Sequence, residues 1–342
     1  MDHPGAGDVT AEELYQAIVE DYPDHLPGTR PVHAVGMVAT GTFVASPVAA
    51  RFTSAEHFRG DPVAVTVRFA NGSGSSTVHD GSRDVRGMST KFHLPSGAET
   101  DLLMVTMPLF FAATPAEFLG FVRAGVPVPR SAPGRLARTA DALRLRLPLP
   151  DPEPDQADGL EGVVAFADDN PSARAGTVAM MSLVTPTSYA RVAYHALHAF
   201  ALTDGTGAVR YARFNWDPVA GVRPYPPPAP DDYLRAELAQ RLAEGPARFV
   251  LRMTLAEPGD ALDDPTRWWD TTRQRVVMGE LALTALADDQ DEANRRLSFN
   301  PARLVPGFGR PPDPVFAARG PVYEYSCRQR GGSGCPVLGA SG

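Results

Sequence analysis

Residues 63–70 read VAVTVRFA, and the character of the side chains alternates along this stretch. One face collects Val63, Val65, Val67 and Phe69, while the other collects Ala64, Thr66, Arg68 and Ala70. A period of two residues is typical of a β-strand with one apolar face. We therefore expect the valine face to lie in a core and the Arg68 face to line a pocket.

Strand patterns recur on both sides of this stretch. Further strands are predicted at residues 32–43, 88–94, 101–107, 247–256 and 276–286. Residues 199–216 predict a hairpin that turns at Asp204-Gly205-Thr206-Gly207. So many strands expose edges, and closing the sheet on itself removes them. We expect a mostly antiparallel sheet closed into a barrel.

Helical patterns lie mainly before and between these strands. Thr10 and Glu13 form a capping-box signature at the start of a helix over residues 11–22. Other helices are predicted at residues 115–124, 134–147, 187–199 and 231–243. Residues 148–172 are rich in Pro and Asp and predict a surface excursion, and the last forty residues predict irregular structure. The expected fold class is α+β, an antiparallel barrel with flanking helices and a long wrapping segment.

Composition narrows the class of protein. The chain has 342 residues, 43% hydrophobic and 21% charged, which is a globular balance. A net charge of -8 argues against an electrostatic nucleic-acid binder. No run of about 18 apolar residues predicts a membrane span, and no secretory signal is visible at the N-terminus. Cys327 and Cys335 are too few for a disulfide framework or a zinc site, so we expect a cytoplasmic protein; the two could pair on oxidation.

The basic residues are of almost one kind. Of 32 basic residues, only Lys91 is a lysine. Genomic base composition explains this bias most simply. The alternative is that some of the arginines bind anions through their forked guanidinium groups.

Several short motifs follow one another in a recognisable order. They are RPVHAVG at 30–36, GTF at 41–43, VRFANGSG at 67–74, RDVRGMSTKF at 83–92, MPLFF at 107–111, FNPARLVPG at 299–307 and DPVFAARGPVY at 313–323. Together these motifs resemble the haem catalases over roughly residues 20–330. The short chain resembles the minimal catalase-related peroxidases of that superfamily. The resemblance implies a catalase-like barrel, a haem b cofactor and peroxide as substrate.

The resemblance implies two residues that face the iron. His33 matches the distal base, which would take a proton from a peroxide and return it to the leaving oxygen. Tyr323 matches the axial ligand, and Arg319, four residues earlier, would favour the phenolate that binds iron. The alternatives are that His33 is an ordinary buried histidine and that Tyr325 is the ligand.

Other matched residues would hold the porphyrin. Arg30, Arg68 and Arg330 match the arginines that pair with the haem propionates, for which the guanidinium fork is suited. Phe110 and Phe111 match an apolar channel wall. Phe118 matches an aromatic ring that stacks over the haem. Solvated surface arginines and ordinary core phenylalanines are the alternative interpretations.

The sequence departs from full catalases at three places. Asp313 matches the acidic member of the relay behind the proximal arginine, but Asn215 stands where the histidine is expected, so we predict an altered relay. His195 and His198 are assigned to a helix face. Val105 replaces a distal Asn, and Ala70 replaces the Ser that orients the distal His. These two changes predict a chamber that suits alkyl hydroperoxides and gives weak catalase activity.

The predicted function is a haem-dependent peroxidase that reduces hydrogen peroxide or organic hydroperoxides with a small external electron donor, as in defence against oxidative stress. One alternative is a lipid hydroperoxide isomerase like allene oxide synthase, which has Thr before the distal His where this chain has Val32. A second is a haem or apolar-ligand carrier without turnover. The sequence does not reveal whether NADPH binds, although the short chain makes this less expected.

Three segments are predicted. Residues 1–29 form an N-terminal helix and arm, residues 30–330 form one haem-binding domain, and residues 331–342 form a flexible tail. A homo-oligomer, either a dimer or a tetramer, is expected. Partners other than peroxide and the donor, such as nucleic acid or a membrane, are not expected.

Overall fold

A computed structural model describes residues 9–22, 24–125, 159–224 and 230–331 of the chain. The strands are β1 Gly36–Ala45, β2 Val63–Asn71, β3 Arg86–His93, β4 Glu99–Val105, β5 Tyr194–His195, β6 Phe200–Thr203, β7 Val209–Pro218, β8 Ala247–Leu255, β9 Arg275–Leu286 and β10 Phe308–Gly309. The α-helices are α1 Ala11–Glu20, α2 Pro115–Ala124, α4 Gly159–Asp169, α5 Ala173–Met181, α6 Tyr233–Glu244, α7 Gln290–Arg296 and α8 Pro314–Gln329. Short 3-10 turns are η1 Ala49–Arg51, η2 Glu56–Phe58 and η3 Tyr189–Arg191. The predicted helix 134–147 lies outside the described residues.

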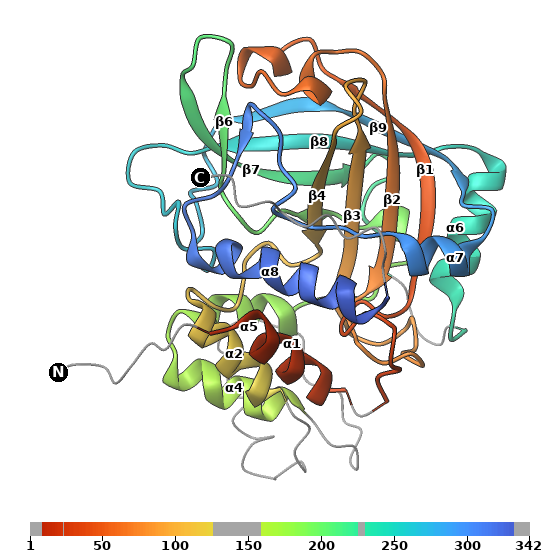
Figure 1. Ribbon diagram of the computed structural model, residues 1–342, viewed down its shortest axis with the longest axis vertical. Coiled ribbons are helices and arrows are strands. Elements are labelled where there is room, and N and C mark those ends of the chain that lie inside the picture. The colour runs from red at the N-terminus through yellow and green to blue at the C-terminus, as the bar shows by residue number, and fades with distance from the viewer. Residues whose placement is uncertain (1–8, 23, 126–158, 225–229, 332–342) are drawn as a thin grey trace.

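The sheet closes into a barrel, as predicted. Antiparallel pairs run in the order β1-β2-β3-β4-β5-β7-β8-β9, and β9 pairs with β1 again. The pairing of β4 with β5 is the shortest in the ring. It consists of one residue pair, Val105 with His195. β6 and β10 extend from β7 outside the ring. Figure 1 shows the strands wrapping around one interior.

Aromatic side chains fill the barrel. Phe43 on β1 makes edge-on contacts with Phe58, Phe92 and Trp216, at ring-centroid distances of 5.9, 5.3 and 5.9 Å. The valines of β2 also face this interior, while Arg68 projects from the other face of the strand. The alternation read from residues 63–70 is therefore confirmed.

One glycine permits the tight approach of β1 and β9. The register shifts between Thr40 and Gly41, and a Cβ at Gly41 would lie 2.0 Å from the Ala282 carbonyl oxygen. Only glycine fits this irregularity, because any side chain would overlap the neighbouring backbone.

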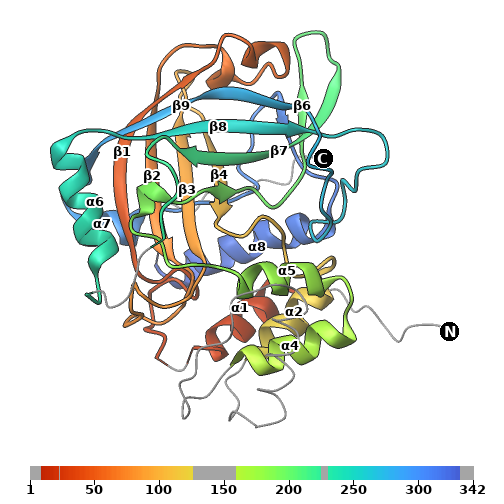
Figure 2. The ribbon, with the colours of Figure 1, turned by 180° about the vertical axis from the view of Figure 1, so that it is seen from behind.

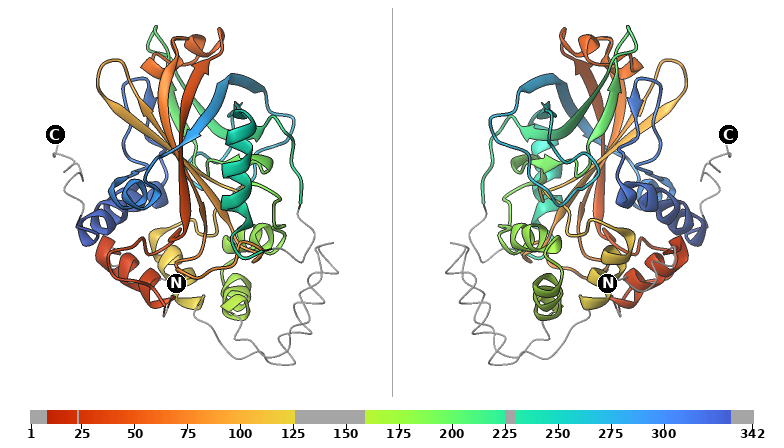
Figure 3. Two further views of the ribbon diagram at one scale, coloured as in Figure 1. Left: turned by 90° about the vertical axis from the view of Figure 1, so that its right-hand side faces the viewer. Right: turned by 90° about the vertical axis from the view of Figure 1, so that its left-hand side faces the viewer.

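Several helices gather at one end of the barrel (Figure 1). Helices α1, α2, α4 and α5 form a group there, and α8 lies against α1 (Figures 1 and 2). Figure 3 shows that α6 and α8 lie on opposite sides of the barrel. Segments from both ends of the described chain therefore meet beside the strands that carry Arg68 and Val105.

Most of the helices predicted within the described residues are present in the structure. Helix α1 begins at the Thr10 cap with both bonds of the capping box, and α2 covers the predicted residues 115–124. The hairpin around Asp204 is formed by β6 and β7. In the part of the chain that the structure describes, no helix has the length and apolar character needed to cross a membrane.

Three local predictions were wrong. Residues 187–199 are not a helix but η3, the short strand β5 and an extended buried stretch. The excursion 148–172 includes helix α4 from residue 159. The last forty residues include the sixteen-residue helix α8, because Pro314 occupies its first turn, where a missing N–H costs nothing. Asp313 caps that helix by accepting a hydrogen bond from Phe316 N over 2.7 Å.

Candidate active site

His33 lies just before β1, in a loop against β2 and β3. Its Nδ1 is 2.9 Å from the Asn71 carbonyl oxygen, and its backbone N donates to the Gly72 carbonyl over 2.9 Å. A Cβ at Gly87 would lie 2.9 Å from the imidazole Cε1, so a glycine at this point of β3 makes room for the ring. Burial, followed by the charge of Arg68, lowers the pKa of His33 to about 4. The imidazole is therefore a neutral base at physiological pH.

Arg68 and Arg30 lie on the same side of the barrel. Arg68 donates to the His33 carbonyl over 2.8 Å and to Asn294 Oδ1 over 2.7 Å. Arg30 donates to the carbonyls of Asn294 and Leu297, both over 2.6 Å, at the C-terminal end of α7. That position is favourable for a cation because the last carbonyls of a helix carry partial negative charge.

Arg330 completes a group of three guanidiniums, in which Arg68 is buried and Arg30 and Arg330 are half-buried residues. Its Nε is buried without a hydrogen-bond partner, and no described carboxylate forms an ion pair with Arg30, Arg68 or Arg330. Burial and then the charges of Arg68 and Arg330 lower the pKa of Arg30, while Tyr323 raises it. Three guanidiniums without a carboxylate partner among the described residues thus lie near one another, an arrangement that could hold an anion with more than one negative charge.

Helix α8 brings Arg319 and Tyr323 to one face, because residues four apart lie one above the other. Arg319 donates to the Tyr323 hydroxyl oxygen over 3.2 Å. Tyr325 points elsewhere: its hydroxyl lies 3.1 Å from Glu12 Oε1, and its ring stands 5.1 Å from that of Tyr15 on α1. Of the two tyrosines, Tyr323 is therefore the one that contacts Arg319, while Tyr325 contacts α1.

The relay behind Arg319 corrects one prediction. Arg319 donates to His198 Nε2 over 2.8 Å, and His198 Nδ1 donates to Asp313 Oδ2 over 2.5 Å. The relay therefore has its histidine at position 198, and the assignment of His198 to a helix face was wrong. Asn215 takes no part, because it lies on β7 and bonds instead to Asp217 over 2.6 Å.

Sequence periodicity does not identify His198. Leu197 and Ala199 are buried as well as His198, so burial does not alternate along this extended stretch. The adjacent Ala and Leu residues suit a helix as well, which is why the local composition misled the prediction.

Aromatic rings form the wall between α2 and α8. Phe110 stacks on Phe111 at 4.1 Å, and Phe118 on α2 meets both rings edge-on, at 5.2 and 5.5 Å. Val105 packs against the same group, while Ala70 is buried next to Asn71 on β2. Phe110, Phe111, Phe118 and Val105 thus form one apolar group, and both Val105 and Ala70 have apolar side chains.

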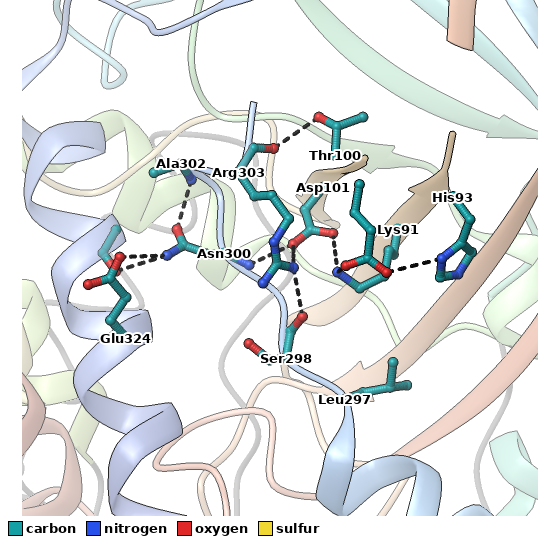
Figure 4. Close-up of polar contacts among 12 residues, drawn as sticks. Lys91, His93, Thr100, Asp101, Leu297, Ser298, Asn300, Ala302, Arg303 and Glu324 are labelled. Atoms are coloured by element: carbon teal, nitrogen blue, oxygen red, sulfur yellow. Dashed lines mark hydrogen bonds and ion pairs between the residues drawn. The ribbon is translucent and has the colours of Figure 1, made fainter. Parts of the chain in front are cut away.

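A cluster of charged side chains on β3, β4 and the segment after α7 lies next to α8. Lys91 bonds Asp101 over 2.9 Å, and Arg303 pairs with the same carboxylate (Figure 4). Asn300 donates through its backbone N to Asp101 over 2.9 Å, and its side-chain amide lies 3.4 Å from the Gly320 carbonyl. The segment around Asn300 therefore ties the β3–β4 hairpin to the turn of α8 that bears Arg319.

Comparison with known proteins identifies the family. The family model described as Catalase matches residues 16–143 and 150–338. The chain belongs to the catalase family. It is 33% identical over 321 residues to a catalase-related peroxidase of Mycolicibacterium paratuberculosis, covering 90% of each chain. It is 30% identical over 329 residues to a catalase-related peroxidase of Synechococcus elongatus, covering 94% of this chain and 90% of that one.

Solved structures confirm the catalase fold. A fungal catalase superposes with a TM-score of 0.74 at 20% identity, covering 89% of this chain and 60% of the other. A bacterial catalase gives 0.74 at 19% identity, covering 92% and 59%. This catalase-family chain thus spans about three fifths of the length of those catalases.

Proposed function

We propose that the protein is a haem-dependent peroxidase that reduces hydrogen peroxide or organic hydroperoxides with a small external electron donor and has weak catalase activity. The observation that carries the proposal is the chain of contacts from Tyr323 through Arg319 and His198 to Asp313. Such a chain fixes a phenol oxygen beside a cation, which favours the phenolate needed to ligate iron. The peroxidases of two bacteria at 30–33% identity support the same reaction.

The residues present fit haem, and we propose haem b. The unpaired Arg330 Nε and the uncompensated guanidiniums of Arg30 and Arg68 suit two propionates. Tyr323 would ligate the iron, and Phe118 would contact the porphyrin. When bound, the haem would supply the electrons for cleavage of the O–O bond of the peroxide.

His33 carries the proton chemistry in this proposal. Its neutral Nε2 takes the proton of the peroxide, and the ring becomes an imidazolium. The same atom then returns the proton to the distal oxygen, which leaves as water from hydrogen peroxide or as an alcohol from an alkyl hydroperoxide. The low pKa of His33 makes the imidazolium a strong acid for this second transfer.

Arg319 holds Tyr323 in place while the proton moves. Its guanidinium lies between the phenol oxygen and His198, so the charge of the phenolate would be balanced without added solvent. His198 accepts from Arg319 only when Nε2 is unprotonated, and burial lowers its pKa and keeps it so. Asp313 in turn accepts the Nδ1 proton and fixes this tautomer.

The apolar side chains favour peroxidase over catalase turnover. Hydrogen peroxide acting as a reductant needs polar partners to orient it, and Val105 and Ala70 offer none. An alkyl hydroperoxide instead gains from contact with apolar walls. The electron donor would be a small organic molecule such as a phenol.

The remaining proposals concern the molecule as a whole. Residues 30–330 would form the haem domain, residues 1–29 an arm whose helix α1 packs on α8, and residues 331–342 a tail. Cys335 and most of that tail lie outside the described residues, so pairing with Cys327 stays a prediction. We further propose a cytoplasmic homo-oligomer that acts against oxidative stress.

One spectroscopic experiment tests the proposal. The purified protein, expressed with adequate haem supply, is mixed with one equivalent of cumene hydroperoxide, and its ultraviolet–visible spectrum is followed before and after addition of a phenolic donor. We expect a haem spectrum with a phenolate ligand that changes on peroxide and returns with the donor. Absence of bound haem favours the carrier alternative, and a rearranged fatty-acid hydroperoxide formed without donor favours the isomerase; either result overturns the proposal.

A further inference from the structure

Asn71, the last residue of β2, uses every polar atom of its side chain. The residue is 0% exposed. The Tyr189 hydroxyl donates to Asn71 Oδ1 over 2.9 Å, and Asn71 Nδ2 donates to Asp80 Oδ1 over 2.7 Å. Its backbone carbonyl is the acceptor for His33 Nδ1 at 2.9 Å. A single buried residue thus joins a polar network to the imidazole.

The network is anchored on both sides. Asp80, which is 1% exposed, accepts with Oδ2 from Leu234 N over 2.8 Å in the first turn of α6. The N-terminus of a helix favours a carboxylate because its free N–H groups carry partial positive charge. On the other side, the ring of Tyr189 stacks on Phe69 at 5.3 Å. Asn71 therefore cannot rotate without leaving buried polar atoms unpaired.

The bond to the Asn71 carbonyl decides the tautomer of His33. A carbonyl oxygen only accepts, so Nδ1 carries the proton and Nε2 keeps its lone pair. Ala70 has no hydroxyl that could share this task. Within the described ranges, no second hydrogen bond to the ring of His33 occurs.

The backbone of His33 makes this contact more important. Its φ is 56°, in the left-handed region that residues other than glycine rarely adopt. Such a conformation persists only where neighbouring contacts hold it. The bonds from His33 N to the Gly72 carbonyl and from Nδ1 to the Asn71 carbonyl are contacts of this kind. The two acceptors are the last residue of β2 and the residue directly after it.

We propose that Asn71, locked by Asp80 and Tyr189, is the positioning residue that fixes the tautomer and the orientation of His33. The proposal rests on the proposed function, in which Nε2 must be free to accept the peroxide proton. The opposite tautomer would present an N–H to the peroxide and could not act as a base. Asn71 does this without touching the substrate, through its own carbonyl.

The test compares three variants with a matched control. Asn71→Ala removes both side-chain bonds, Asp80→Asn removes the carboxylate, and Tyr189→Phe removes one hydroxyl. Tyr194→Phe is the control: its hydroxyl is equally buried and donates to the Tyr189 carbonyl over 2.9 Å, but it does not bond Asn71. The two tyrosine variants lose the same atoms from neighbouring residues.

The first measurement reads the tautomer directly. Histidine labelled with nitrogen-15 is incorporated, the His33 signals are assigned by their loss in His33→Gln, and two-bond nitrogen–proton correlations show which ring nitrogen bears the proton. We expect Nδ1–H alone in wild type and in Tyr194→Phe. A mixture of both tautomers is expected in Tyr189→Phe and Asp80→Asn, and a larger share of Nε2–H in Asn71→Ala. This readout does not depend on turnover, so it decides the proposal even if the proposed peroxidase reaction fails.

The second measurement uses the haem-loaded protein. Cyanide enters as hydrogen cyanide and needs a distal base to take its proton, so its association rate reports the free Nε2. We expect the rate to fall about tenfold in Tyr189→Phe and Asp80→Asn and to stay unchanged in Tyr194→Phe. Pure Nδ1–H signals and wild-type cyanide rates in the Tyr189 and Asp80 variants would overturn the proposal, as would equal losses in both tyrosine variants. If Asn71→Ala does not fold, the other variants still decide.

Discussion

Arg319 and His198 are joined by a hydrogen bond of 2.8 Å, although 121 residues separate them in the chain. The bond places a histidine from the β5–β6 stretch behind an arginine of α8. Since Asp313 both caps α8 and accepts from His198, the start of the helix and the orientation of its arginine are set by the same carboxylate.

The first prediction separates those two roles of Asp313. Asn caps a helix about as well as Asp, so Asp313→Asn should leave α8 intact. It removes the charge that holds His198, and peroxide turnover should fall about ten- to hundredfold, with a shifted phenolate band in the visible spectrum. The control is Asp289→Asn, the same change at the cap of α7. Equal behaviour of the two variants would show that the charge on the relay does not matter.

The second prediction concerns the base. His33→Gln should bind haem normally but slow peroxide cleavage by about 10²- to 10⁴-fold, because a glutamine amide is too weak a base to take the proton. Single-turnover stopped-flow absorbance measures this rate. His93→Gln on the outer face of β3 should cleave peroxide at the wild-type rate. A wild-type rate in His33→Gln would exclude His33 as the base.

The third prediction is a pH profile. Because burial lowers the pKa of His33 to about 4, the imidazole is a free base above that pH. The rate of peroxide cleavage should stay constant as the pH is lowered from neutral, until the pH approaches the pKa of His33. It should then be lost as the pH falls through about 4. Stopped-flow rates in a buffer series test this. A midpoint near 6.5, the ordinary histidine value, would mean that His33 is well hydrated.

The fourth prediction restores polarity to the chamber. The double variant Ala70→Ser, Val105→Asn should raise oxygen release from hydrogen peroxide about ten- to hundredfold, as one or two hydrogen bonds are regained. Turnover of cumene hydroperoxide should fall. Ala64→Ser, an exposed site on the same strand, is the control. Unchanged oxygen release in the double variant would assign the weak catalase activity to another cause.

The fifth prediction concerns stability in acid. His57 lies inside the barrel 4.8 Å from the ring of Phe92, and burial lowers its pKa to about 3. Below about pH 6.5, His57 binds a proton in the unfolded chain but stays neutral in the folded chain. The free energy of unfolding therefore falls as the pH drops toward 3. Relative to pH 7.5, wild type should lose about 2 kcal/mol more than His57→Leu at pH 5. Urea unfolding at both pH values measures the difference; equal losses would contradict it.

Much of the fold could be predicted from local pattern. The alternation in residues 63–70 gave the correct inner face of β2, and Thr10 with Glu13 gave the start of α1. Both signals are short-range, because they depend on residues that are neighbours in the chain. Closure through β5 could not be predicted, since that strand is two residues long and is defined by its partners on β4 and β7.

The site shows the same division. Arg319 and Tyr323 could be paired from their spacing, because both lie on one helix. The partner of Arg319 could not be predicted, because His198 reaches it from a segment 121 residues away in the chain. Asn71 and Asp80 could not be singled out, since a buried polar side chain and an exposed one look alike in sequence.

Lys91 has a consequence for the chemistry of the protein surface. It is the single lysine side chain of the chain, and it is buried in its bonds to Glu99 and Asp101. Every exposed cationic side chain among the basic residues is therefore a guanidinium, which amine-directed reagents do not attack. Acylating labels, lysine cross-linkers and enzymes that modify lysine meet no accessible side-chain amine on this fold. Lys91 becomes reactive only when the β3–β4 hairpin opens. Its rate of acylation would therefore measure local unfolding of this hairpin beside α8.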